Sequence, residues 1–383
     1  MNVRAVVDKL LVLMLLIFLF GGCATTPREH EKPAMSPTKG TATGSHSFGA
    51  FPEGISSQEI QRIREGRRLA ASLEESLRSN GIVDRRDADR LTEIFPEIPN
   101  VWALAGMSAM SEGDYQAAEY GFLRALELDP ANSEALLSMG EIALIQKDLT
   151  GAEDYFEKAY RRSPTPAAAN RLAILQIRLG HLERARTVLS KTLAAFPEDI
   201  MTRNNLAVSM DMMGATTDAL HLLPEDETVD HALLNTRALL RLKEGQPDGA
   251  EHDIRNARPE GNDMVPWLLL GTADLQRGRI REAEVKFRQA VERAPGQPEG
   301  YINLGLSLRR QGKFFEARDV YLEGVRRAPH YDLHLNLGIL DELYRGDFQE
   351  ALLHYREYIG KGGPVSDRVK GWVAYLEGVM ENQ

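Results

Sequence analysis

Two histidines and one glycine-rich segment are the residues whose types and spacing could support chemistry in this 383-residue sequence. His330 and His334 lie four residues apart, so on a helix they would share a face and could ligate a metal ion together. No HExxH pattern follows them and carboxylates nearby are few, which favours two solvated histidines at the start of a helix. We therefore predict no metal site.

The glycine-rich segment 360–363 contains one lysine and could be taken for a phosphate-binding loop. It lacks the glycine lead-in and the Ser or Thr that such a loop uses to hold phosphate and magnesium, so it predicts a turn. The sequence also lacks a nucleophile elbow and a glycine fingerprint after a strand. We expect no enzymatic activity, no cofactor and no small-molecule substrate, although a catalytic site built outside these motifs is the alternative.

The only cysteine, Cys23, ends a segment with the composition of a signal peptide. Arg4 and Lys9 precede the apolar run 10–20, which two glycines separate from Cys23. A helix that crosses a membrane needs about 20 apolar residues, and this run is shorter. Its length suits the apolar region of a signal peptide. An uncleaved anchor with a chance cysteine is the alternative. Lipidation of Cys23 would leave no thiol for a disulfide or a cysteine metal site.

The residues after this segment have the composition of a linker. Residues 23–55 are rich in Pro, Thr, Ser and Gly and contain almost no large apolar side chain. Such a stretch cannot bury a core, so it predicts a flexible tether between the signal peptide at 1–22 and the folded part.

Prolines divide the central part of the sequence into units of 33 or 34 residues. They fall at Pro96, Pro130, Pro164, Pro197, Pro295 and Pro329, and the 98 residues between Pro197 and Pro295 fit three more units. A period of this length is typical of a repeat protein.

Each unit repeats one pattern of small and large residues. Gly140, Ala152, Phe156 and Ala159 show it: a small residue, alanine twelve positions later, an aromatic or aliphatic residue after four more, and a small residue after three more. The last three share one helix face. A small residue at a helix crossing lets two backbones approach, and the Phe ring fills the gap beside the next pair. Each helix pair can bury its apolar face only by stacking on its neighbours.

This pattern resembles the tetratricopeptide repeat, a 34-residue pair of antiparallel helices. The register extends over residues 99–360, is degenerate in the middle, and needs one inserted residue in its last unit between Gly338 and Ala351. The resemblance implies an all-α, right-handed superhelical solenoid of about eight helix pairs. We expect residues 56–98 to form capping helices or a degenerate repeat, and residues 361–383 to form a C-terminal capping helix that covers the open end.

A solenoid of this kind offers a concave surface lined by the first helix of each pair. In the repeat register, polar residues recur at positions six and thirteen of that helix. Amides there could pair with a peptide backbone and cations would form a basic edge, while solvated charges and structural amide bonds are the alternatives. Position six is occupied by Arg171, Asn205, Asn303 and Asn336, and position thirteen by Arg178, Lys243 and Arg310.

The order of a candidate lipidated cysteine, a tether and about eight repeats is similar to that of envelope-assembly lipoproteins. These are the pilotins of type IV pilus secretins and the Tad pilus assembly lipoproteins. The resemblance implies lipidation at Cys23, attachment to the periplasmic face of a bacterial outer membrane, and a protein or peptide partner in the groove. It implies a scaffold for assembly of a pilus or secretion complex, with an exopolysaccharide-export scaffold as the alternative. The net charge of −10 and the lack of a basic run argue against nucleic acid as a partner.

Overall fold

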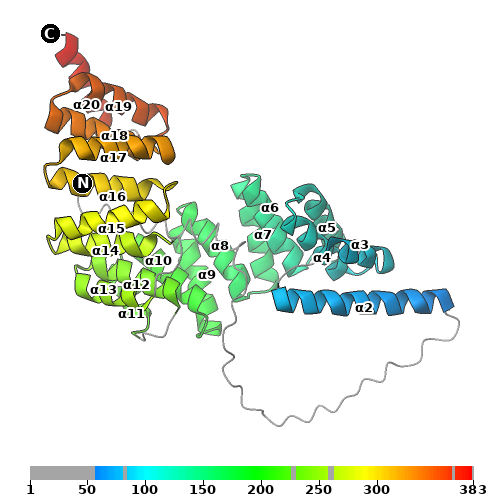
Figure 1. Ribbon diagram of the computed structural model, residues 1–383. Helices are drawn as coiled ribbons and strands as arrows, with labels where there is room; N and C mark the ends of the chain where they lie inside the picture. The colour runs from blue at the N-terminus through cyan, green and yellow to red at the C-terminus, as the bar shows by residue number, and fades with distance from the viewer. Residues whose placement is uncertain (1–56, 81–83, 226–229, 258–262, 365–366, 382–383) are drawn as a thin grey trace. The chain divides into compact units, whose positions relative to one another are not determined.

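The computed structural model describes residues 57–80, 84–225, 230–257, 263–364 and 367–381, and in these ranges the chain is helix and turn without a strand (Figure 1). The predicted signal peptide, the tether and Cys23 lie outside these residues. No helix in the described ranges is long and apolar enough to cross a membrane.

Eight consecutive pairs of antiparallel helices make up most of the described chain, which confirms the prediction of an all-α tetratricopeptide solenoid. The pairs are α4 (Pro99–Ser111) with α5 (Tyr115–Leu128), α6 (Ser133–Ile145) with α7 (Leu149–Arg162), α8 (Pro166–Arg178) with α9 (Leu182–Ala195), α10 (Ile200–Met212) with α11 (Thr216–Leu222), α12 (His231–Lys243) with α13 (Pro247–Asn256), α14 (Val265–Gln276) with α15 (Ile280–Arg293), α16 (Pro298–Arg310) with α17 (Phe314–Arg327), and α18 (Tyr331–Leu340) with α19 (Phe348–Gly360). A π-helical turn, η1 (Asp341–Arg345), follows α18. Helices α2 (Ser57–Asn80) and α3 (Arg85–Ile94) precede the pairs, and α20 (Asp367–Glu381) follows them.

The contacts divide the described chain into two compact units. The first unit ends at Pro197 and the second begins at Glu198. In the second unit the first helices of successive pairs, α10, α12, α14, α16 and α18, pack against one another and form one layer.

The repeat pattern of the sequence becomes the core of each helix pair. Ala152, Phe156 and Ala159 are buried, as their shared helix face predicts. The small residue of the first helix was expected to allow a close approach of two backbones, but in the structure it makes room for an aromatic ring. A Cβ atom added to Gly106 would lie 2.7 Å from Cε1 of Phe122, so this position receives the ring of its own pair. The close approach of backbones occurs at Gly121, where a Cβ would lie 2.9 Å from the Cα of Gly106.

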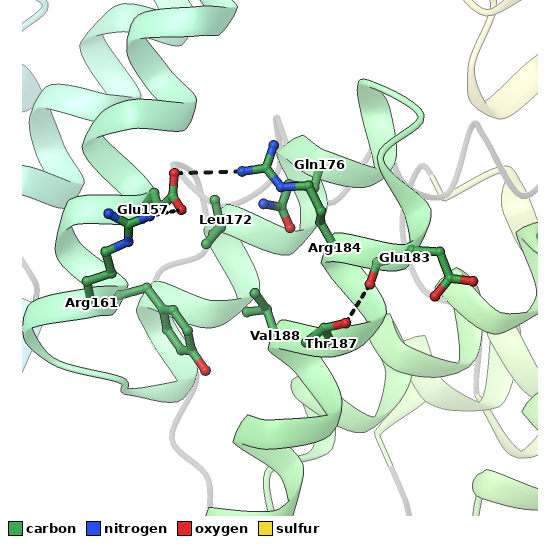
Figure 2. A pocket seen from close by; sticks show the side chains of 9 residues that line it. Glu157, Arg161, Leu172, Gln176, Glu183, Arg184, Thr187 and Val188 are labelled. Atoms are coloured by element: carbon green, nitrogen blue, oxygen red, sulfur yellow. Dashed lines mark hydrogen bonds and ion pairs between the residues drawn. The ribbon is translucent and has the colours of Figure 1, made fainter.

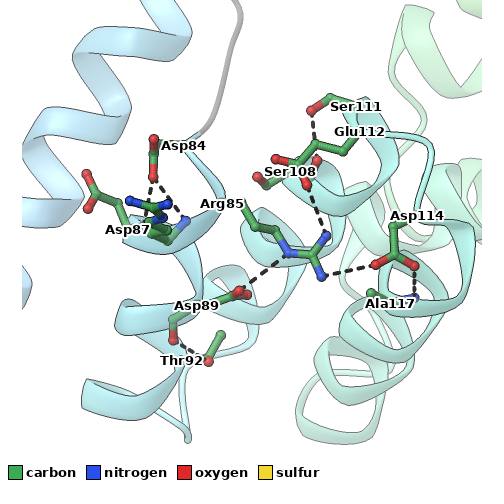
Figure 3. A network of polar contacts seen from close by, with 11 residues as sticks. Asp84, Arg85, Asp87, Asp89, Thr92, Ser108, Ser111, Glu112, Asp114 and Ala117 are labelled. Atoms are coloured by element: carbon green, nitrogen blue, oxygen red, sulfur yellow. Dashed lines mark hydrogen bonds and ion pairs between the residues drawn. The ribbon is translucent and has the colours of Figure 1, made fainter.

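Helix α3 is joined to the first helix pair, α4 and α5, by an arginine that lies between acidic side chains (Figure 3). Arg85 Nε lies 3.4 Å from Asp89 Oδ2, Nη1 lies 3.4 Å from Glu112 Oε2, and Nη2 lies 3.3 Å from Asp114 Oδ2. Asp114 is also the N-cap of α5, because it accepts a hydrogen bond from the amide of Ala117. That amide and Arg85 together hold the pKa of Asp114 below its ordinary value. Arg85 therefore links α3 to the corner between α4 and α5.

The degenerate middle of the array contains a buried ion pair in place of apolar packing. Arg237 occupies the repeat position that Leu172 fills in an earlier pair, and its side chain is only 1% exposed. Its Nη2 donates to Asp253 Oδ1 at 2.6 Å, and Arg241 Nη1 lies 2.8 Å from the same oxygen. A charged pair replaces the leucine here, which explains why the apolar pattern fades in this repeat.

Candidate functional site

Two of the predicted groove residues, Arg171 and Arg178, lie on α8 in the first unit, and both are exposed. Arg171 Nε donates to Glu141 Oε1 of α6 at 2.6 Å, so its charge is paired across neighbouring first helices. Arg178 ends α8 and makes no ion pair within the part of the chain that the structure describes. Of the two, Arg178 is the side chain that offers an open charge.

The three position-six asparagines, Asn205, Asn303 and Asn336, lie in the second unit and are all buried, at 2–4% exposure. Asn303 Nδ2 donates to the carbonyl of Glu299 at 2.9 Å, and Asn336 Nδ2 donates to the carbonyl of Asp332 at 2.8 Å. Each acceptor lies one turn earlier in the same helix, so these amide groups serve the helix that carries them. The repeat register could not distinguish this local bond from contact with a ligand.

The position-thirteen cations of the second unit differ from each other. Lys243 Nζ lies 2.7 Å from Asp211 Oδ2, whose side chain is completely buried, so Lys243 neutralises an internal carboxylate. Arg310 is exposed at the end of α16 and has no ion pair among the described residues. Helices α16 and α18 pack against each other. Asn303 and Arg310 on α16 therefore lie on a helix next to the one that carries Asn336.

A pocket of about 370 Å³ opens in the first unit between α7, α8 and α9 (Figure 2). Its apolar lining comes from Tyr160, Leu172 and Val188. Charged side chains around it pair with each other: Arg184 Nη2 lies 3.7 Å from Glu157 Oε2. The volume is at the lower end of the range of about 300–1,000 Å³ for ligand pockets, and an apolar lining with a polar rim suits a single side chain of a bound peptide.

A second surface, which was not predicted from the sequence, lies at the helix corners of the last two pairs. Phe315, Leu343 and Tyr344, here named the aromatic patch, are 75%, 65% and 46% exposed. Arginines flank it, since the Cζ atom of Arg309 lies 5.6 Å from the centre of the Tyr344 ring and that of Arg345 lies 5.8 Å from the Phe315 ring. Exposed aromatic residues beside arginines are typical of protein interfaces. The two pairs of adjacent large apolar residues at 314–315 and 343–344 are the feature of the sequence from which this patch could have been predicted.

The two histidines singled out from the sequence do not share a site. His330 is the N-cap of α18, where its Nδ1 accepts a hydrogen bond from the amide of Asp332 at 3.2 Å. The expectation that His334 is solvated is wrong, because this side chain is buried and its Nδ1 lies 3.3 Å from Nδ1 of His354. The partner comes from the second helix of the pair, which no local spacing reveals.

Comparisons with known proteins identify the repeats directly. Family models of the tetratricopeptide repeat match residues 103–169, 143–203 and 268–332. Superkiller complex protein 3 of Mus musculus is 27% identical over 293 residues, which cover 68% of this chain and 18% of that protein. Cellulose synthase 1 operon protein C of Komagataeibacter xylinus is 23% identical over 234 residues, which cover 56% of this chain and 18% of that protein. This chain thus spans about a fifth of the length of these relatives.

Among solved structures, a tetratricopeptide repeat protein from Parabacteroides merdae superimposes with a TM-score of 0.51. It is 21% identical, and the match covers 64% of this chain and 98% of that one. At this identity the likeness concerns the fold, and it agrees with the helix pairs described above. The chain therefore carries tetratricopeptide repeats over residues 103–203 and 268–332 and has the all-α fold of a tetratricopeptide solenoid, a fold suited to binding other proteins.

Proposed function

We propose that this chain is a lipid-anchored scaffold of the bacterial envelope, which binds protein partners and supports assembly of a pilus or secretion complex. The observation that carries the binding role is the aromatic patch. Phe315, Leu343 and Tyr344 expose large apolar side chains, and arginines lie over the two aromatic rings. Exposure of apolar surface to water is unfavourable, and a bound partner would cover it.

The open cations and the pocket support the same role. Arg178 and Arg310 end the first helices of their repeats without an ion-pair partner among the described residues, so they can meet carboxylates of a partner. The pocket lined by Leu172 and Val188 can receive one apolar side chain. In this proposal the buried asparagines Asn303 and Asn336 stiffen the helices behind the groove, and the arginines make the contacts.

The membrane attachment rests on the N-terminal sequence alone. Cys23 after an apolar run and two glycines is the acylation candidate, and Ala24 in place of aspartate favours the outer membrane. Replacing Cys23 by serine should abolish labelling with radioactive palmitate while leaving the signal peptide uncleaved. Labelling equal to wild type would contradict lipidation at this residue.

A second candidate, a scaffold for polysaccharide export, is favoured by the match to cellulose synthase 1 operon protein C. The two functions differ in the proteins that should accompany the chain. Cross-linking in intact cells, followed by purification from detergent-solubilised membranes, should recover pilus or secretion subunits under the first proposal. Recovery of polymer-synthesis or polymer-export subunits alone would favour the second.

A further inference from the structure

The last helix pair contains a one-residue insertion, and the insertion places an aspartate in the interior. The small residue of the first helix and the alanine of the second are separated by twelve positions in the regular repeats but by thirteen between Gly338 and Ala351. The π-helical turn η1 accommodates the extra residue and begins with Asp341, whose side chain is completely buried. Such turns are rare and occur frequently at functional sites.

Three side chains of metal-binding types converge on this turn. One atom each of Asp341, Glu350 and His354 lies within 4.8 Å of the others. His354 Nε2 is 3.9 Å from Asp341 Oδ2 and 3.9 Å from Glu350 Oε2. Atoms bound to one tetrahedral zinc ion at about 2.0–2.2 Å lie about 3.3–3.6 Å apart, so the two separations of 3.9 Å would shorten by about 0.3–0.6 Å when an ion binds.

Two of the converging atoms are buried and have no hydrogen-bond partner among the described residues. They are Asp341 Oδ2 and His354 Nε2. His354 is 7% exposed, and the separation of 3.9 Å is too long for a hydrogen bond to Asp341. Buried polar atoms are nearly always satisfied in proteins, so an unpartnered donor or acceptor needs an explanation. A bound cation would satisfy both atoms at once.

The neighbouring side chains hold these two atoms toward each other. Arg345 Nη1 and Arg318 Nε lie 2.5 and 3.4 Å from the other carboxylate oxygen, Asp341 Oδ1, and leave Oδ2 for a ligand. His334 Nδ1 lies 3.3 Å from His354 Nδ1. When His354 donates this hydrogen bond, its Nε2 presents a lone pair to the carboxylates, as in histidines that bind metals.

The position of Glu350 also suits an ion. Glu350 is 40% exposed and accepts a hydrogen bond from Arg318 Nη2 at 3.0 Å. Glu350 would therefore exchange its bond to Arg318 for a bond to the ion. Its partly exposed side chain lies on the side of the site that faces solvent.

We propose that Asp341, Glu350 and His354 bind a divalent transition-metal ion. Zinc accepts this donor set, because it binds both imidazole nitrogen and carboxylate oxygen, and three protein ligands leave a fourth position for water. Calcium and magnesium prefer oxygen ligands alone. The ion would join η1 to α19 and fix the inserted turn.

The test uses the full-length chain, stripped of metal with a chelator and freed of any affinity tag. We expect calorimetric titration with Zn²⁺ to give one ion per chain, and Co²⁺ to give the absorption bands of a site with nitrogen and oxygen ligands. His354→Gln and Glu350→Gln should each weaken Zn²⁺ binding at least about 10-fold. His334→Phe, which removes the hydrogen bond to His354, should weaken it by about 10–100-fold.

Glu357→Gln is the matched control, since this exposed carboxylate lies on the same helix as Glu350 and is outside the cluster. It should leave Zn²⁺ affinity unchanged. Absence of Zn²⁺ and Co²⁺ binding to the wild-type chain would overturn the proposal. So would unchanged affinity in Glu350→Gln, a partly exposed position where circular dichroism should show an intact fold even if the His354 variant unfolds.

Discussion

Gly271→Ala tests the packing of the repeats, because the glycine faces a ring with no room for a methyl group. A Cβ atom at this position would lie 2.7 Å from Cζ and 2.8 Å from Cδ1 of Phe287, which is itself completely buried. Ordinary carbon contacts are about 3.5–4.0 Å, so the ring would have to move by about 1 Å. Overpacking of this kind costs about 1–3 kcal/mol, against a gain of about 1 kcal/mol from alanine's better helix propensity. We expect a net loss of up to about 2 kcal/mol.

The same substitution in another helix should have the opposite sign. Gly371 lies in α20, where an added Cβ atom would have no neighbouring atom within 4 Å, so Gly371→Ala should gain stability by about 0.8–1 kcal/mol from helix propensity alone. Both variants would be measured by urea unfolding followed by circular dichroism. Adding Phe287→Leu to Gly271→Ala should recover part of the loss, as seen in a double-mutant cycle. If both glycine variants gained stability alike, the ring would not occupy the position assigned to it.

Three other predictions concern charge, backbone and pH. Asp253→Ala should cost about 3–5 kcal/mol in urea unfolding, because it leaves Arg237 buried without its carboxylate; a loss under about 1 kcal/mol would show that water already reaches the pair. Lys147 has a φ of 64° at a corner where most other repeats use glycine, so Lys147→Gly should raise stability by about 1 kcal/mol; a lower melting temperature would contradict this. Burial alone would raise the pKa of Glu284, but hydrogen bonds from three side chains, including Lys313, lower it to about 2. Because the folded-state value lies below the unfolded one, Glu284 stabilises the fold above about pH 4.5 and loses up to about 3 kcal/mol as the pH falls toward 2. Glu284→Gln should remove this part of the acid dependence, and an unchanged profile would refute it.

The sequence predicted the features that depend on local spacing. The register of Ala152, Phe156 and Ala159 specifies one buried helix face, and this face is buried in the structure. The thirteen-residue spacing before Ala351 signalled an insertion, although the spacing alone could not show that a π-helical turn absorbs it.

The features that depend on contacts between helices could not be predicted in the same way. Arg237 and Asp253 lie sixteen residues apart, and His334 and His354 lie twenty apart, without a motif that links them. The amide of Asn303 could donate a hydrogen bond either to a carbonyl of a bound peptide or to a carbonyl of its own helix. Only the geometry of α16 shows that it bonds to its own helix. Exposure of Phe315 likewise depends on how the corner between α16 and α17 is covered.

The proposed binding role is tested most directly by recovery of cross-linked partner proteins with the double variant Phe315→Ala and Tyr344→Ala. Exposed residues of this kind should cost the fold little, so helicity and melting temperature should stay close to wild type. Tyr375→Ala, at an aromatic residue on α20 whose exposure of 61% lies between those of Phe315 and Tyr344, is the matched control. We expect the double variant to lose about 2 kcal/mol or more of binding, a drop of about 30-fold in affinity, while the control keeps its partners. Equal recovery by the folded double variant and wild type would contradict the assignment of the aromatic patch as the surface through which this scaffold binds.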